Sequence, residues 1–176
     1  RRRKAALTRG ARAFAKKPRE GLKLLQREGL FRQQQQQQQQ QQPSLDAKEV
    51  AAFLRATPGL DKAAVGAYLG EAGTKRVNGR GGGGGGGSIP EGTVAEFHAE
   101  VLEAFVDTFD FRGQGILASL RMFLGAFRLP GEAQQIDRIL HAFAQRVHRD
   151  CVEAARGMLA SADVAYLLSF SVVSSN

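Results

Sequence analysis

The chain has 176 residues, of which 43% are hydrophobic and 24% charged, and its formal net charge is +8 at pH 7. This length is typical of one domain with an ordinary core. The sequence has no run of 18 or more apolar residues and no charged-then-apolar leader, which argues against a membrane-spanning or exported protein. We expect a soluble, intracellular protein. Its one cysteine, Cys151, cannot form an internal disulfide bond, which agrees with a reducing compartment.

The positive charge is concentrated near the N-terminus. Residues 1–32 hold 12 Lys or Arg and 2 Asp or Glu, a balance of +10 that leaves −2 for the rest. Such a cluster forms a solvated helix face or attracts the phosphates of anionic lipids or nucleic acid. No aromatic residue occurs in the first thirteen positions, so the stacking platforms of single-strand binders are missing there. We expect a solvated basic face, with peripheral contact to anionic membranes as the alternative, and no binding of nucleic acid or DNA.

Two low-complexity tracts interrupt the chain, ten glutamines at 33–42 and seven glycines at 81–87. Neither composition repays the entropy lost on ordering, so we expect two disordered insertions. The expected organisation is basic N-terminal helices at 1–32, a polyglutamine insertion at 33–43, a helical part at 44–72, a glycine-rich insertion at 73–93, and a second helical part at 94–176.

Apart from these tracts, apolar residues recur at helical spacing along the chain. A first helix is expected over 5–17, and Pro18 ends it or opens a second helix at its first turn. Residues 43–49 resemble a helix start, and the helix that follows ends at Pro58-Gly59. A fourth apolar stripe covers 60–69.

The helical spacing is stronger after the glycines. Apolar stripes run over 97–109, 116–127, 136–147 and 164–172, with a turn at 112–115 and a break at Pro130-Gly131. No segment alternates with period two, so a sheet is not expected. The pattern predicts an all-α fold of seven or eight amphipathic helices packed through these stripes.

Two short motifs imitate catalytic signatures in the wrong context. Residues 113–118 fit the G-x-G-x-x-A spacing of dinucleotide sites, but they follow a helical pattern where that site needs a strand. The triplet at 148–150 imitates a kinase catalytic loop without its later asparagine. His141, His148 and Cys151 supply at most three ligands, whereas a zinc site normally has four. We expect no metal and no cofactor.

A carboxylate follows a Pro-Gly pair between two predicted helices. In the segment FRLPGEAQQIDR at 127–138, Glu132 lies at the expected start of a helix. A negative charge stabilises this end of a helix by about 0.3–1 kcal/mol, which is a purely structural explanation.

This segment closely resembles the first signature motif of the Sec-seven domain, the catalytic module of guanine nucleotide exchange factors for Arf small GTPases. Segments at 16–30, 59–71, 101–113, 118–146 and 161–173 resemble the family in the family's order. The resemblance implies a right-handed superhelical stack of helices. It also implies a C-terminally truncated domain, because Ser174, Ser175 and Asn176 stand where the family continues its second motif.

The resemblance implies that Glu132 is the catalytic residue, which enters the nucleotide site of a GDP-bound Arf near Mg²⁺ and the β-phosphate. Like-charge repulsion there weakens nucleotide binding without covalent chemistry or a cofactor. The implied location is cytoplasmic, peripheral to the Golgi or other endomembranes, in the regulation of Arf signalling and vesicle trafficking. The alternative is a catalytically silent helical interaction module or a truncated fragment. The implied GTPase-binding residues are Phe127, Arg128, Leu129, Pro130, Gly131, Ala133, Gln134, Phe170, Ser171 and Asn176.

Overall fold

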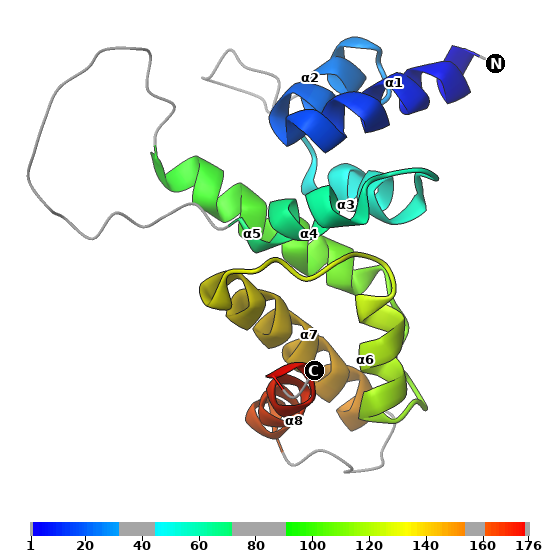
Figure 1. Ribbon diagram of the computed structural model, residues 1–176. Helices are drawn as coiled ribbons and strands as arrows, with labels where there is room; N and C mark the ends of the chain where they lie inside the picture. The colour runs from blue at the N-terminus through cyan, green and yellow to red at the C-terminus, as the bar shows by residue number, and fades with distance from the viewer. Residues whose placement is uncertain (1, 32–44, 72–90, 154–160, 175–176) are drawn as a thin grey trace, which may run out of the picture.

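The computed structural model describes residues 2–31, 45–71, 91–153 and 161–174, which form eight α-helices and no strand (Figure 1). The predicted all-α fold is confirmed. In the described residues, no helix has the length and apolar character needed to cross a membrane. The polyglutamine and polyglycine tracts lie outside the described residues, so their predicted disorder remains a prediction. The helices are α1 (Arg2–Lys16), α2 (Pro18–Arg27), α3 (Ala47–Ala56), α4 (Lys62–Gly70), α5 (Glu91–Asp107), α6 (Ile116–Leu124), α7 (Ala133–Glu153) and α8 (Ala162–Ser174).

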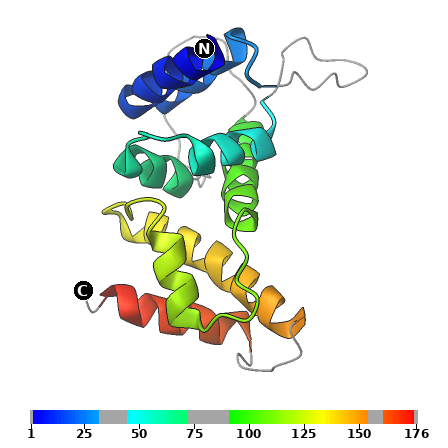
Figure 2. The ribbon, with the colours of Figure 1, turned by 90° about the vertical axis from the view of Figure 1, so that its right-hand side faces the viewer.

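Helices α1 and α2 form a hairpin at one end of the molecule (Figures 1 and 2). Pro18 is the first residue of α2, which is one of the two predicted alternatives. Proline suits this position because it lacks an N–H, and an N–H here would have no acceptor within the helix. Phe14 of α1 and Leu25 of α2 are fully buried. On the outside, Arg9 and Glu28 form an ion pair at 2.7 Å.

The middle layer consists of α3, α4 and the first part of α5 (Figure 1). Aspartates cap two of these helices. The carboxylate of Asp46 accepts a hydrogen bond from the backbone N–H of Lys48 at 2.8 Å, and that of Asp61 accepts one from Ala63 at 2.8 Å. Each cap satisfies an N–H that has no partner within its helix. The cap of α4 bears on function, because this helix supports the loop described below.

An aromatic cluster joins α5, α6 and α7 in the other half of the molecule. Phe123 lies at its centre, with ring centroids 5.1 Å from Phe127 and 5.1 Å from Phe143. Phe105 and Phe109 of the α5 region pack against the same ring at 6.3 and 5.4 Å. These contacts fix the two helices on either side of the loop that carries Glu132.

Helix α6 is shorter than the sequence predicted. The predicted apolar stripe extended to Phe127, whereas the helix ends at Leu124 and the chain then continues without helical structure to Glu132. Phe127 keeps its place in the core because its ring still packs on Phe123. In this segment, the backbone N–H of Arg128 donates to the carbonyl of Lys62 in α4 instead of to a carbonyl of its own helix.

Candidate functional site

Residues 125–132 form the loop between α6 and α7, called here the Glu132 loop. Glu132 occupies the position before the first residue of α7. Its carbonyl oxygen accepts hydrogen bonds from the backbone N–H groups of Gln135 at 3.0 Å and Ile136 at 3.1 Å, so its backbone starts the helix. The carboxylate therefore lies at the positive end of the α7 dipole.

The side chain of Glu132 is exposed to solvent. Among the residues that the structure describes, no hydrogen bond or ion pair engages its carboxylate. The next residues of the helix, Ala133 and Gln134, are also exposed. The loop thus presents an anion with a fixed backbone and a free side chain, which is suited to contact with a second molecule.

The Glu132 loop lies directly on α4, and two glycines of that helix make this possible. A Cβ atom on Gly66 would lie 1.7 Å from the carbonyl oxygen of Arg128. On Gly70 it would lie 2.8 Å from Cβ of Gln135 and 3.2 Å from Cγ of Pro130. Because the glycines are four residues apart, they share one face of α4. That face is the seat of the loop and of the first turn of α7.

Three hydrogen bonds hold the loop at this seat. The backbone N–H of Arg128 donates to the carbonyl of Lys62 at 2.9 Å, and the Lys62 ammonium donates to the carbonyl of Gly125 at 2.6 Å. From α7, the guanidinium of Arg138 donates to the carbonyl of Gly70 at 2.5 Å. The bonds join both sides of the loop to one helix, so Glu132 lies on a rigid base.

The sequence motifs did not predict which residues support the Glu132 loop. Gly66 and Gly70 belong to a segment that resembles the family, but their role as the seat of the loop was not predicted. A pair of glycines four apart in one helix is the feature that could have suggested a close approach of another backbone. No sequence pattern around Lys62 or Arg138 suggested that these residues would hold the loop.

One of the predicted partner-contacting residues, Phe127, is buried in this structure. Phe127 is only 3% exposed, and its ring packs on Phe105 at 5.9 Å and Phe123 at 5.1 Å. A side chain so deeply packed supports the loop from beneath. Leu129 and Pro130 are half-buried, whereas Arg128 and Gly131 are exposed like Glu132.

Helix α8 brings the other predicted partner-contacting residues beside α7. Phe170 is 41% exposed, and the Ser171 hydroxyl donates to the carbonyl of Leu167 at 2.8 Å. The Tyr166 ring stacks on His141 of α7, with centroids 4.1 Å apart, and lies 5.9 Å from that of Phe170. Asn176 lies outside the described residues. The structure thus brings two of the three predicted C-terminal residues onto a helix that packs on α7.

A hydrogen bond fixes α8 to the first part of α7. The hydroxyl of Tyr166 donates to the carboxylate of Asp137. This bond is the main cause that raises the pKa of Tyr166 above its ordinary value, because the neutral hydroxyl is the form that donates. The Glu132 loop, α7 and α8 are therefore connected through named contacts.

Much of the outer side of α8 is apolar. Exposed fractions are 61% for Leu167, 45% for Leu168 and 40% for Val172, and Val173 is half-buried. Contiguous apolar residues on a surface are typical of interaction sites.

The two imitative motifs have structural roles. Gly113 adopts a positive φ of 72° in the turn before α6, a conformation that suits glycine. Asp150 is buried and accepts hydrogen bonds from the backbone N–H of Phe111 at 3.0 Å and from the Arg146 guanidinium at 2.8 Å. Both residues stabilise the turn that follows α5.

Comparison with known proteins extends these observations. A family model described as "Sec7 domain" matches residues 3–176. "Brefeldin A-inhibited guanine nucleotide-exchange protein 1" of Bos taurus is 33% identical over 97% of this chain. "ADP-ribosylation factor guanine nucleotide-exchange factor SEC7" of Saccharomyces cerevisiae is 34% identical over 99% of it, and "ARF guanine-nucleotide exchange factor GNOM" of Arabidopsis thaliana is 36% identical over 95%. The chain spans only 7%, 7% and 9% of the length of these relatives.

Solved structures agree with the sequence comparison. The crystal structure of the Sec7p catalytic domain matches with a TM-score of 0.69 at 34% identity, covering 96% of this chain and 72% of that one. A structure of ARF1-GDP bound to a Sec7 domain complexed with brefeldin A matches with a TM-score of 0.69 at 26% identity, over 97% and 68%. Because the family match spans almost every residue and the helical architecture agrees with it, this chain belongs to the Sec7 domain family.

Proposed function

We propose that this chain is a guanine nucleotide exchange factor for an Arf-type small GTPase, and that Glu132 is its catalytic residue. The observation that carries the proposal is the exposed, unpaired carboxylate of Glu132 on a loop bound to α4. Family membership supports the same activity, since relatives across nearly the whole chain are named as exchange factors.

The proposed mechanism is electrostatic. Glu132 enters the nucleotide site of the GDP-bound partner and places a negative charge beside the β-phosphate, where Mg²⁺ otherwise compensates the phosphate charge. Repulsion between like charges at short distance weakens GDP binding, most strongly where water is excluded. The rigid base matters because a carboxylate that could withdraw from the phosphate would lose this repulsion. GDP dissociates and GTP then binds.

The partner-binding surface in this proposal consists of the exposed part of the Glu132 loop, the first turn of α7 and one side of α8. Arg128, Gly131, Ala133 and Gln134 lie beside the carboxylate in sequence and are exposed. Phe170 adds an apolar contact from α8, while Leu129 and Pro130 contribute the part of their surface that remains accessible. Ser171 and Asn176 complete the proposed set.

The wider context belongs to the same proposal. We infer one helical module in which the polyglutamine and glycine-rich segments are insertions. It acts on the cytoplasmic side of the Golgi or another endomembrane, in contact with anionic lipids, and regulates Arf signalling in vesicle traffic.

The test is the release of a fluorescent GDP analogue from a purified Arf-type GTPase. We expect the unmodified chain to accelerate release and Glu132→Lys to abolish the acceleration. Glu132→Gln, which removes the charge and keeps the shape, is expected to lose most of it. Circular dichroism should show unchanged helicity, because the loss at the helix start is only about 0.3–1 kcal/mol.

The matched control is Glu100→Lys, the same chemical change at an exposed position of α5. This variant should remain active, since it lies outside the proposed partner-binding surface. An active Glu132→Lys variant would refute the catalytic assignment.

A second candidate function is a catalytically silent interaction module, favoured by the exposed apolar residues of α8. In that case the chain binds the GTPase without accelerating GDP release. Binding measured by calorimetry, with no effect of the unmodified chain on release, would favour this second function over exchange.

A further inference from the structure

The outer side of the α1–α2 hairpin carries a dense set of cations. On α1, Arg9, Arg12 and Lys16 are spaced by three and four residues, so they form a stripe opposite buried Phe14. On α2, Lys23 and Arg27 are one turn apart and lie opposite the buried side of that helix, and Lys17 lies between the two helices. All are exposed. The set, called here the basic surface, comprises Arg9, Arg12, Lys16, Lys17, Lys23 and Arg27.

The charge of this surface is poorly compensated. Residues 2–28 contain ten Lys or Arg and only two acidic residues, Glu20 and Glu28. Each glutamate already has a partner, Lys23 at 3.5 Å and Arg9 at 2.7 Å respectively. Within the described part of the chain, no ion pair engages the remaining four cations of the basic surface. Their positive field is therefore directed to solvent.

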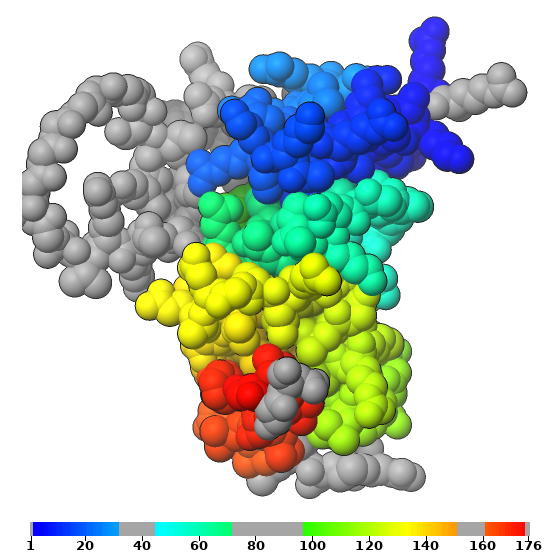
Figure 3. Space-filling view, viewed as in Figure 1, coloured from blue at the N-terminus to red at the C-terminus, as the bar shows by residue number. Residues whose placement is uncertain are grey.

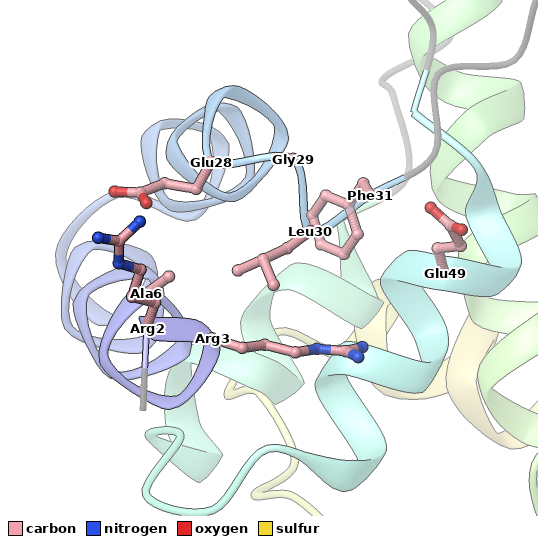
Figure 4. A pocket seen from close by; sticks show the side chains of 8 residues that line it. All are labelled: Arg2, Arg3, Ala6, Glu28, Gly29, Leu30, Phe31 and Glu49. Carbon is pink, nitrogen blue, oxygen red and sulfur yellow. The ribbon is translucent and has the colours of Figure 1, made fainter.

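A neighbouring cavity does not share this character. A cavity of about 700 Å³ lies between α1, the end of α2 and α3 (Figure 4). Its basic residues, Arg2 and Arg3, share its lining with Glu28 and Glu49, and Figure 4 shows Arg2 reaching toward Glu28. The balance of charge in the cavity makes it a poor anion site. The anion-attracting region is the outer side of the hairpin.

The position of the hairpin leaves the Glu132 loop uncovered. Figure 3 shows α1 and α2, in blue, at one end of the molecule, with the yellow region that includes the loop on the middle of the visible face. Figure 2 shows the same separation after a quarter turn. A large flat partner can therefore contact the end of the molecule while the side with the loop stays open.

The chemistry of the hairpin favours lipid headgroups over bases. Its two aromatic residues in the described range, Phe14 and Phe31, are buried, so no ring is exposed for stacking. None of the large exposed apolar side chains of the described residues lies on the hairpin. Binding here would therefore be electrostatic and superficial, without insertion into the acyl region. We propose that the basic surface is the site of the lipid contact inferred in the proposed function, on which this inference rests: it binds the anionic headgroups of a membrane and holds the Glu132 loop to one side of it.

The test is co-sedimentation of the full chain with vesicles, in the absence of any GTPase. We expect binding to phosphatidylcholine vesicles that contain phosphatidylserine, none to phosphatidylcholine alone, and release as salt rises from about 0.1 M to about 0.5 M, because screening shortens the range of charge. The variant R12Q/K16Q/K17Q/R27Q removes the four unpaired cations and keeps residues that tolerate helices. At about fivefold in affinity for each charge, the loss of four charges should lower the affinity by about 600-fold.

The matched control is K48Q/R55Q/R112Q/R121Q, which removes four exposed cations on other elements and has the same net charge. This variant should bind vesicles like the unmodified chain. Equal loss in both variants, equal binding to neutral vesicles, or tighter binding to duplex DNA than to anionic vesicles would each overturn the proposal. Glu132→Lys should bind vesicles normally, so failure of the exchange assay and failure of this one are distinguishable.

Discussion

The carbonyl oxygen of Arg128 lies 1.7 Å from the point that a Cβ atom would occupy on Gly66. No side chain fits between α4 and the backbone of the Glu132 loop at this point. The position of the proposed catalytic carboxylate thus depends on a residue in another helix, more than sixty positions earlier in the chain. The consequences can be measured.

Replacing Gly66 with alanine should displace the loop. The new methyl group must push against backbone, so we expect the free energy of unfolding to fall by about 1–3 kcal/mol, even though alanine favours helix by about 1 kcal/mol over glycine. Release of GDP from the GTPase should slow, because Glu132 moves with the loop. Urea denaturation and the nucleotide-release assay check the two effects.

Ala67→Ser serves as the control for Gly66→Ala, because Ala67 is an exposed position of the same helix. It should change stability by less than about 0.5 kcal/mol. If Gly66→Ala proves as stable and as active as the unmodified chain, the close contact does not position the loop.

Arg138→Met should loosen the first turns of α7 from α4. It removes the charged hydrogen bond to the carbonyl of Gly70 and leaves that acceptor without its partner. We expect a loss of about 1–3 kcal/mol in the free energy of unfolding, measured by urea denaturation. Arg138→Lys keeps a donor and should recover part of this loss, whereas equal losses in both variants would mean that packing of the side chain is what matters.

The helices and the corner at Glu132 were predictable because they depend on local patterns. The helical spacing of apolar residues predicted the helices, and a Pro-Gly pair predicted the break before α7. The end of α6 was predicted too late, because Phe127 continues the spacing of Phe123 and Leu124. The Phe127 ring also reaches the core from an irregular segment. The spacing of apolar residues alone therefore cannot distinguish a helix that continues to Phe127 from one that ends at Leu124.

The support of the loop was not predictable from local patterns. Lys62 and Arg138 make their bonds to residues more than sixty positions away, at Gly125 and Gly70. Such contacts depend on how α4 lies across α7, which no spacing within either helix specifies. The free carboxylate of Glu132 also depends on this packing, because the chain supplies many cations and the fold keeps them away from it.

Stability should decline in mild acid partly because of His98. This side chain is 4% exposed, and burial, the largest cause, lowers its pKa below the usual 6.5, with nearby Glu71 opposing and Arg19 adding to the shift. The unfolded chain therefore binds a proton at higher pH than the folded chain does. The stability due to neutral His98 is complete above 6.5 and falls as the pH drops below 6.5 toward the folded-state value.

His98→Leu isolates this contribution, because other groups titrate alike in both proteins. Urea denaturation at about pH 7.5 and about pH 5.5 should show a smaller loss of stability on acidification for the variant than for the unmodified chain. Identical losses in the two proteins would mean that His98 does not titrate in this range.

Tyr166→Phe should weaken the attachment of α8 to α7 while it keeps the ring that stacks on His141. Loss of the hydrogen bond to Asp137 should lower the free energy of unfolding by about 0.5–1.5 kcal/mol. Because Phe170 lies one turn further on the same helix, the proposed GTPase contact should also suffer, as a higher KM with little change in kcat. Asp137→Asn retains an acceptor oxygen and should show smaller effects on both quantities. If Tyr166→Phe instead lowers kcat at constant KM, the tyrosine acts on the Glu132 loop through α7 and not on the docking surface of α8.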